Sequence, residues 1–204
     1  MFDYLSIPQS EWRNPMPPNI QRLRSIGRWC EDLVLPDGRQ LRLRPIAAED
    51  ADALRHGFEL LSADEVRMRF MHPMSELTPE LAKRLADLDH KRDFAIVASE
   101  PLPPGEALIG AVVRASIAPD GRRAEFAILV SRLLGGQGLG RLLMKQIIRW
   151  AKLKRLDELY GDVLEENTTM LKLATSLGFR REHQPDDRGV VRVRLALRKG
   201  VALH

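Results

Sequence analysis

Four glycines lie within six residues in the stretch LGGQGLGR, residues 134–141, which follows the apolar run AEFAILV and precedes an amphipathic segment. Glycine ahead of a helix costs roughly 0.5–1 kcal/mol per position relative to alanine, so a compensating role is expected. The first N–H groups of a helix have no intrahelical partner and carry partial positive charge, and glycines let an anion approach them closely. The stretch therefore predicts a loop that binds phosphate.

Two better-known phosphate-binding loops do not fit this stretch. A Walker loop ends in Gly-Lys-Ser/Thr, whereas Gly140 is followed by Arg141 and Leu142. A dinucleotide-binding loop has the spacing G-x-G-x-x-G, whereas Gly136, Gly138 and Gly140 give G-x-G-x-G. A phosphate-bearing ligand of another kind is therefore predicted, and a glycine loop without a ligand is the alternative that stays open.

The segments on either side of the loop read as a mixture of strands and helices. Apolar residues three and four apart predict helices over residues 50–61, 77–88, from the glycine loop to about 154, and 167–176. Alternation or short apolar runs predict strands over residues 94–99, 107–117, 124–130, 159–164 and 190–197, with a hairpin around Pro36-Asp37-Gly38. A short helix is expected near residues 20–29, within an irregular arm. This order predicts an α/β domain with a mixed sheet.

Composition narrows the class of protein. The chain has 204 residues, 44% hydrophobic and 29% charged, which suits one domain plus an extension. Neither a transmembrane helix nor a signal peptide is expected, because long apolar runs are missing. Cys30 is the only cysteine, which excludes an internal disulfide and fits a cytoplasmic location.

Charge and histidine spacing argue against two further functions, nucleic-acid binding and metal binding. A net charge of +4 with 5% aromatic residues gives little support to nucleic-acid binding. The five histidines lack the spacing of metal ligands, so no metal is expected.

Two motifs together resemble one enzyme family. Gly138-Leu139-Gly140 after a strand looks like the R/Q-x-x-G-x-G/A acyl-CoA signature of the GNAT superfamily of N-acetyltransferases. Downstream, Glu166-Asn167 and Leu177-Gly178-Phe179 resemble the next motif of that superfamily, in the expected order. The resemblance implies a mixed, mostly antiparallel sheet of about six to seven strands flanked by helices, with its fourth and fifth strands splayed to admit acyl-CoA.

The resemblance also implies a division of the chain. The acetyltransferase domain is expected to span residues 39–198. Residues 1–38 are expected to form an extension that ends in a hairpin strand, and residues 199–204 a C-terminal tail.

Further segments are similar to the acetyltransferase domain of the bacterial Pat-type protein lysine acetyltransferases. They are Leu43-Arg44-Pro45-Ile46, Arg67-Met68-Arg69-Phe70, Asp93-Phe94-Ala95-Ile96-Val97-Ala98 and Ala124-Glu125-Phe126-Ala127. This similarity implies acetyl-CoA as cosubstrate and a protein lysine as acceptor. A small-molecule amine as acceptor and a non-catalytic module that senses acyl-CoA are the alternatives, and a homodimer is left open.

The resemblance assigns roles to individual positions. The pantetheine arm is expected to meet the backbone of Ile128, Leu129 and Val130. Amides of the glycine loop and first helical turn are expected to bind the pyrophosphate; these residues are Gly136, Gln137, Gly138, Leu139, Gly140 and Arg141. Asn167 matches the position that bonds the pantetheine or stabilises that region.

Glu125 matches the glutamate that acts as general base in the family. A lysine ammonium has a pKa near 10.4 and must lose a proton before it attacks a thioester, and a nearby carboxylate can accept that proton. Because Glu125 lies in an otherwise apolar strand, burial is expected to tune it for this role. The alternative is an outward-facing glutamate on the polar side of the strand.

Two positions depart from the family pattern. Gly135 stands where the signature usually has Arg or Gln, so a side chain that helps to fix the cofactor is missing. Ala174 stands where many members carry a tyrosine that protonates the thiolate, and solvent is expected to supply that proton instead.

The segment around Phe70 offers further candidates. Arg67 and Arg69 are interpreted either as contacts to a CoA phosphate or an acidic substrate, or as solvated arginines. Met68, Met71 and Met74 are expected to pack in the core, with an acceptor groove as the alternative.

Overall fold

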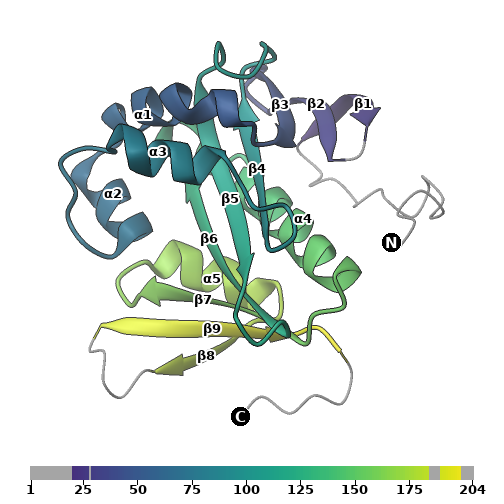
Figure 1. The fold of residues 1–204 in the computed structure, drawn as a ribbon, viewed down its shortest axis with the longest axis vertical. Helices are drawn as coiled ribbons and strands as arrows, with labels where there is room; N and C mark the ends of the chain where they lie inside the picture. Colours follow the sequence, from purple (N-terminus) through teal and green to yellow (C-terminus); the bar gives the residue numbers. More distant parts are fainter. Residues whose placement is uncertain (1–19, 28, 184–188, 199–204) are drawn as a thin grey trace.

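The computed structural model describes residues 20–27, 29–183 and 189–198. In this part of the chain nine strands form one sheet, in the order β1-β2-β3-β4-β5-β6-β7-β9-β8 (Figure 1). The strands are β1 (Gln21–Gly27), β2 (Cys30–Val34), β3 (Gln40–Pro45), β4 (Asp93–Ser99), β5 (Ile109–Ile117), β6 (Arg123–Val130), β7 (Glu158–Leu164), β8 (Arg180–His183) and β9 (Val190–Ala196). The helices are α1 (Ala51–Glu59), α2 (Ala63–Phe70), α3 (Pro79–Ala86), α4 (Leu139–Leu153) and α5 (Thr168–Ser176), with short 3-10 turns η2 (Ala48–Asp50) and η3 (Arg132–Leu134).

The sheet is mixed and mostly antiparallel. β6 and β7 are its parallel neighbours, and every other adjacent pair runs antiparallel. The predicted α/β class, the hairpin of β2 and β3 and the splayed strand pair, which is β6 and β7 here, are confirmed. The tail at residues 199–204 lies outside the described residues.

Two strands and one helix differ from expectation, so the count of about six to seven strands is too low. The helix expected near residues 20–29 is wrong, because β1 pairs with β2 there, Gln21 opposite Val34. β8 was not expected, and it pairs with β9, Arg180 opposite Arg194. Both are edge strands, where cross-strand pairing outweighs a weak local pattern.

Helix α2 was also not expected, although its start carries a recognisable signal. Ser62 and Glu65 form a capping box: the Ser62 side chain accepts from the Glu65 N–H at 3.3 Å, and the Glu65 carboxylate accepts from the Ser62 N–H at 2.9 Å. The spacing S-x-x-E therefore fixes where this helix begins.

The helices cover both faces of the sheet. Alternation along β4 directs Ala95 and Val97 toward a cluster with α1 and α3, and Ile96 and Ala98 toward the larger cluster that contains α4. Figure 1 shows α1 and α3 in front of the strands β4–β6 and α2 to the left of β6, with β7, β9 and β8 crossing below them. The core therefore sits in two layers, one on each face of β4 and β5.

A buried ion pair joins β3 to the start of α1. Arg44 donates to both carboxylate oxygens of Asp50, at 2.6 Å and 2.8 Å. Asp50 is 0% exposed and also accepts from the N–H groups of Ala47 and Gly105. Burial alone would raise the pKa of the Asp50 carboxyl, but these hydrogen bonds and the charge of Arg44 outweigh it and hold the pKa below its usual value.

Within the described residues, no helix is both long and apolar enough to cross a membrane.

Candidate active site

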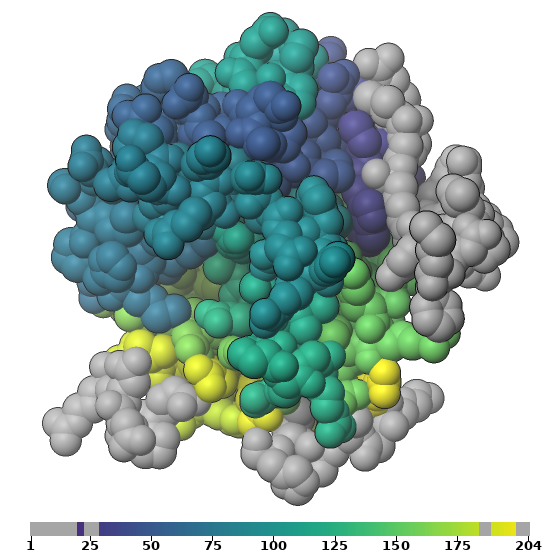
Figure 2. Space-filling view, viewed as in Figure 1, coloured from purple at the N-terminus to yellow at the C-terminus, as the bar shows by residue number. Residues whose placement is uncertain are grey.

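A cleft of about 700 Å³ opens where β6 and β7 part. Its wall is formed by β6, the glycine loop and first turn of α4, part of β7, the start of α5, and α2. Figure 2 shows the surface hollowed between the blue and teal helices and the yellow strand β9. The cleft is large enough for a drug-sized ligand, since such sites usually measure about 300–1,000 Å³.

The cleft exists because the pairing of β6 with β7 is short. The parallel register runs from Arg123 opposite Glu158 to Glu125 opposite Tyr160, and no pair follows in the described strands. On its other side β6 stays paired with β5 as far as Val130. The last residues of β6 therefore present a free backbone edge to the cleft, at the positions expected to meet the pantetheine arm.

A phenylalanine and a glycine lie where the two strands separate. The Phe126 ring lies so close to Gly161 that a Cβ there would be 2.8 Å from the ring and 2.9 Å from the Phe126 carbonyl oxygen. Phe126 also makes an edge contact with Phe179, the last residue of the Leu-Gly-Phe motif, with 5.4 Å between ring centroids. The motif thus supports the strand that lines the cleft, after Gly178, at φ +94, has ended α5.

The glycine loop has the backbone that its composition predicts. Gly136 and Gly138 have φ values of +72 and +87, a region that residues with a Cβ rarely adopt. Gly138 is the N-cap of α4, and the first helical bond runs from the Leu142 N–H to the Gly138 carbonyl. The amides of the first turn precede that bond and lie at the wall of the cleft, which is the arrangement that binds an anion at a helix start.

Most residues predicted to bind the cofactor line this one cleft. They are Ile128, Leu129, Val130, Gly136, Gly138, Leu139, Gly140, Arg141 and Asn167. Gln137 does not line it, because its side chain donates to the Asp37 carboxylate at 2.9 Å, in the turn of the β2–β3 hairpin. The expected part of Gln137 in binding can therefore only come from its backbone.

Asn167 serves as the N-cap of α5. Its side-chain oxygen accepts from the Met170 N–H at 3.0 Å, which leaves its amide hydrogens to donate. The residue therefore fixes the start of α5 and can still donate to a ligand in the cleft.

Glu125 lies in the cleft at the last β6–β7 pair. The expectation that the apolar strand buries it is wrong, because its side chain is exposed. Alternation along β6 puts Phe126 in the core and Glu125 on the face that α2 covers only in part. The carboxylate is thus open to a ligand that enters the cleft.

Three residues surround Glu125 that the sequence did not predict there. Tyr160 and Arg114 were not predicted as site residues, and Arg69 was a candidate without a position near Glu125. Tyr160 is the partner of Glu125 on β7, and Arg114 on β5 shares its face, since Arg114 pairs with Ala127 and Ser116 with Glu125. Arg69 reaches the same place from α2, and its charge interacts with those of Arg114 and Glu125. Period-two alternation from Glu125 was the signal available for the strand residues, whereas nothing local reveals Arg69.

The surroundings shift the pKa values of these groups. Burial raises the pKa of Tyr160, and the negative charge of Glu125 adds to the rise. Burial lowers the pKa of Arg69 to about 10, with the positive charge of Arg114 acting in the same direction and Glu125 opposing it. Burial also lowers the pKa of Arg114. The Tyr160 hydroxyl and both guanidiniums are therefore protonated at neutral pH.

The two departures from the family pattern have different structural settings. Ala174 is fully buried in the core, so its position faces away from the cleft. Gly135 lines the cleft and has φ −64, a value open to any residue, so the backbone itself does not demand glycine there.

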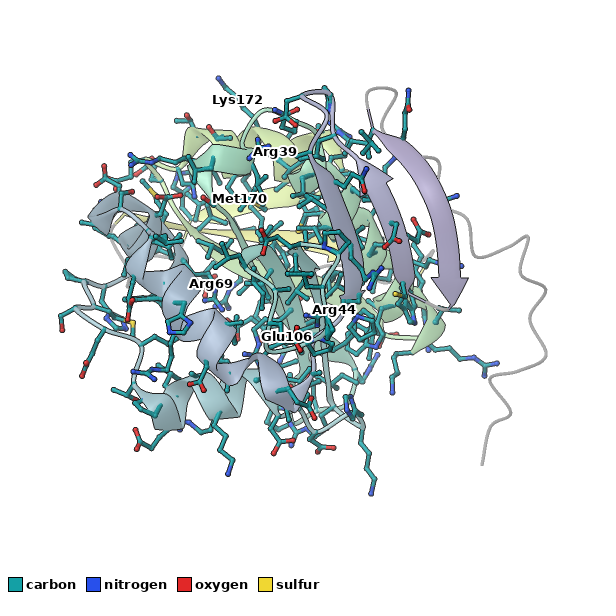
Figure 3. All side chains as sticks on the ribbon, turned by 90° about the horizontal axis from the view of Figure 1, so that it is seen from above. Arg39, Arg44, Arg69, Glu106, Met170 and Lys172 are labelled. Atoms are coloured by element: carbon teal, nitrogen blue, oxygen red, sulfur yellow. The ribbon has the colours of Figure 1, made fainter. Side chains whose placement is uncertain are left out.

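Helix α2 forms the roof of the cleft and is tied down on two sides. The Glu65 carboxylate accepts from the Arg132 N–H at 2.7 Å, and Arg67 forms an ion pair with Glu166, just before α5. Met68 and Met71 line the cleft, whereas Met74 packs against the cluster of α1, α2 and α3. Figure 3 labels Arg69 and Met170, which reach the cleft from α2 and α5.

Comparison with known proteins agrees with this geometry. The model of the Acetyltransferase (GNAT) domain family matches residues 40–180. A curated relative, Acetyltransferase PA5475 of Pseudomonas aeruginosa, is 30% identical over 169 residues, which are 83% of this chain and 89% of that protein.

Solved structures share the fold. The GNAT domain of S. lividans PAT has a TM-score of 0.73 at 25% identity, covering 85% of this chain and 99% of that one. The structure of yncA from Salmonella typhimurium with its cofactor acetyl-CoA has a TM-score of 0.61 at 16% identity, covering 79% and 96%. The chain belongs to the GNAT acetyltransferase family and is an acetyl-CoA-dependent N-acetyltransferase.

Proposed function

We propose that the enzyme transfers the acetyl group of acetyl-CoA to the side-chain amine of a protein lysine, with Glu125 as general base. The observation that carries this proposal is the position of Glu125: an exposed carboxylate inside the cleft, where β6 stops pairing with β7. The similarity to the GNAT domain of S. lividans PAT supports a protein lysine as acceptor.

The residues present suit the cosubstrate. The glycine loop and the first turn of α4 would hold the pyrophosphate through backbone amides, with the side chain of Arg141 beside them. The free edge of β6 at Ile128, Leu129 and Val130 would hold the pantetheine arm by main-chain hydrogen bonds. From Val130 to Glu125 the strand advances about 17 Å, so the phosphate end and the base lie at opposite ends of the cleft.

The chemistry follows from these positions. The Glu125 carboxylate takes a proton from the lysine ammonium, directly or through one water, and the freed amine attacks the thioester carbonyl carbon. The new C–N bond forms, the C–S bond breaks, and the thiolate takes a proton from solvent, since Ala174 offers no donor. Main-chain N–H groups along the cleft would stabilise the negative carbonyl oxygen in the tetrahedral intermediate.

The wider setting stays a prediction. We place the catalytic domain at residues 39–198, in the cytoplasm, with a homodimer left open. The first strands of the sheet, β1 and β2, begin before residue 39, so part of the predicted extension pairs directly with the domain.

The decisive experiment compares Glu125→Gln with Asp64→Asn, a change of another exposed carboxylate that lines the same cleft. Loss of the base should lower kcat by about 10²–10⁴-fold, while acetyl-CoA affinity measured by calorimetry stays unchanged. The Asp64 variant should keep its turnover. Full activity of Glu125→Gln would remove Glu125 from the mechanism.

A second assay separates protein from small-molecule acceptors. Mass spectrometry of lysate proteins incubated with the enzyme and acetyl-CoA should show new acetyl-lysines. Thiol release with free polyamines or amino acids, and none with proteins, would instead assign a small-molecule amine as the acceptor.

A further inference from the structure

Two arginines near Glu125 have no hydrogen-bonding or ion-pair partner among the described residues. Neither Arg69 nor Arg114 makes a hydrogen bond or an ion pair with any residue that the structure describes. Both side chains are half-buried, and Arg69 leans over the Phe70 ring with 4.8 Å from its guanidinium carbon to the ring centroid. Because neither guanidinium donates to a described residue, the N–H groups of both are available to a ligand that carries acceptor oxygens.

Other arginines near Glu125 are already engaged. Arg123 pairs with Asp120 at 2.6 Å, and Arg192 donates to both carboxylate oxygens of Asp162, at 2.7 Å and 2.6 Å. The acidic groups that face the two unpartnered arginines act only through space: Glu125 on Arg69, and Asp93 on Arg114. The hydrogen-bonding capacity of these two guanidiniums is therefore left for a ligand.

The phosphates of the cosubstrate are not that ligand. The pyrophosphate-binding loop begins beyond the far end of β6, about 17 Å of strand away from Glu125. Arg69 comes from α2 and Arg114 from β5, and both lie on the sheet face that carries Glu125. The acceptor, whose amine must reach Glu125, is the molecule that meets them.

The positive charge of the acceptor amine indicates which other group the acceptor must have. An amine arrives at Glu125 as an ammonium, and two guanidiniums beside it repel that charge. A carboxylate on the acceptor offsets this repulsion and accepts charge-assisted hydrogen bonds from the guanidinium forks. Once Glu125 has taken the proton and become neutral, the carboxylate is the remaining counter-charge for Arg69.

We infer, on the basis of the proposed function, that Arg69 and Arg114 together bind a carboxylate next to the acceptor amine. For a protein acceptor this is an acidic side chain flanking the lysine; in a free amino acid the α-carboxylate presents the same chemistry. Arg69 and Arg114 are thus specificity-determining residues of the acceptor site.

The test uses lysine peptides with Asp or Glu beside the lysine, matched peptides with Asn or Gln there, and free amino acids, each with acetyl-CoA. The wild-type enzyme should acetylate the acidic peptides with kcat/KM about 10–100-fold above the neutral ones, the range expected of hydrogen bonds to a charged group. If free amino acids are acetylated with a kcat/KM equal to that of the acidic peptides, and if this activity is lost in the arginine variants described next, the carboxylate is the α-carboxylate of an amino acid.

Variants locate the effect. Arg69→Met and Arg114→Met should each lower the ratio of kcat/KM for acidic peptides to kcat/KM for neutral peptides at least several-fold, mainly by raising KM for the acidic peptides. Arg69→Glu should shift the preference toward peptides with a second lysine beside the acceptor lysine. Arg123→Met removes an equal charge from β6 but leaves the two arginines intact, so its ratio should match the wild type.

Three results contradict the inference. Equal kcat/KM for acidic and neutral peptides, with turnover intact, overturns the inference and leaves the proposed function standing. An equal loss of preference in Arg123→Met assigns the effect to general charge and overturns the specific site. No thiol release with any peptide or amine would overturn the proposed function itself, and this inference with it.

Discussion

Two pairs of charged residues that lie against the sheet differ in their hydrogen bonding. Near β3, Arg44 is matched with Asp50, whose carboxylate accepts four hydrogen bonds and is 0% exposed. Near Glu125, Arg69 lines the cleft and Arg114 lies on the same face of β5, and both are half-buried. Neither makes a hydrogen bond or an ion pair with a described residue, so the nearby charges act on them only through space. The buried Arg44–Asp50 ion pair, whose carboxylate is fully hydrogen-bonded, holds the fold together, although Arg44 Nε has no partner. The two guanidiniums without an acceptor near Glu125 are available to a ligand.

The largest expected effect on stability comes from breaking the buried Arg44–Asp50 ion pair. Asp50→Asn leaves the Arg44 guanidinium buried without its counter-charge and should lower the free energy of unfolding by about 3–5 kcal/mol. Denaturant titration followed by circular dichroism measures it. Asp52→Asn is the control: Asp52 is exposed and lies 3.5 Å from Arg55, so its loss should stay below about 1 kcal/mol. Equal losses in the two variants would contradict the structural role of the buried pair.

At low pH the Arg44–Asp50 ion pair should no longer contribute to the free energy of unfolding. Because the folded state holds the pKa of Asp50 below its unfolded value, its stabilisation is complete above the unfolded pKa and is lost as pH falls through the folded pKa. The difference in unfolding free energy between the wild type and Asp50→Asn should therefore narrow below about pH 4. Titrations at several pH values down to 3 test this, and a constant gap would exclude the linkage.

Two glycines of the glycine loop differ in how strongly the backbone requires them. Gly138→Ala forces a residue with a Cβ to φ +87 at the start of α4, which costs about 1–2 kcal/mol, and should weaken acetyl-CoA binding by about tenfold. Gly135→Ala at φ −64 should change the affinity little, since only a 3.2 Å contact with the Arg132 carbonyl oxygen must relax. Calorimetry with acetyl-CoA compares them, and equal affinities would show that the αL conformation is dispensable.

The smallest expected change in stability comes from removing one of the two arginines near Glu125. Arg69→Met removes a half-buried charge that pairs with no carboxylate, so the free energy of unfolding should change by less than about 1 kcal/mol. Arg44→Met, the same substitution in the buried Arg44–Asp50 ion pair, should cost several times more. Thermal and denaturant unfolding of both variants measures the difference, and a large loss in Arg69→Met would make that arginine structural.

Much of the fold was predictable because its signals are local. The helical spacing in α1, α3, α4 and α5, the turn at Pro36-Asp37-Gly38 and the apolar strands each read from a few neighbouring residues. The missed helix α2 had its signal in Ser62 and Glu65, the capping box. The strands β1 and β8 had none of comparable strength, since they exist through pairing with β2 and β9.

The candidate site divides in the same way. The glycine loop and the free end of β6 were predicted as a unit, and they line one cleft with Asn167. Glu125 lines the cleft, and its role as general base stays a prediction. The expected burial was wrong, because a strand of apolar sequence can still open one face to a cleft. Gln137 was included with its neighbours, but the hairpin turn takes its side chain.

By itself the sequence determined the order of the elements, the glycines whose positive φ values shape the loop, and the family to which the chain belongs. Only the tertiary structure decided which side chains surround Glu125. Arg69 is 56 positions away along the chain, and no periodicity links α2 to β5 and β6. Sheet register and helix packing bring them together, since such contacts depend on the whole core rather than on neighbouring residues.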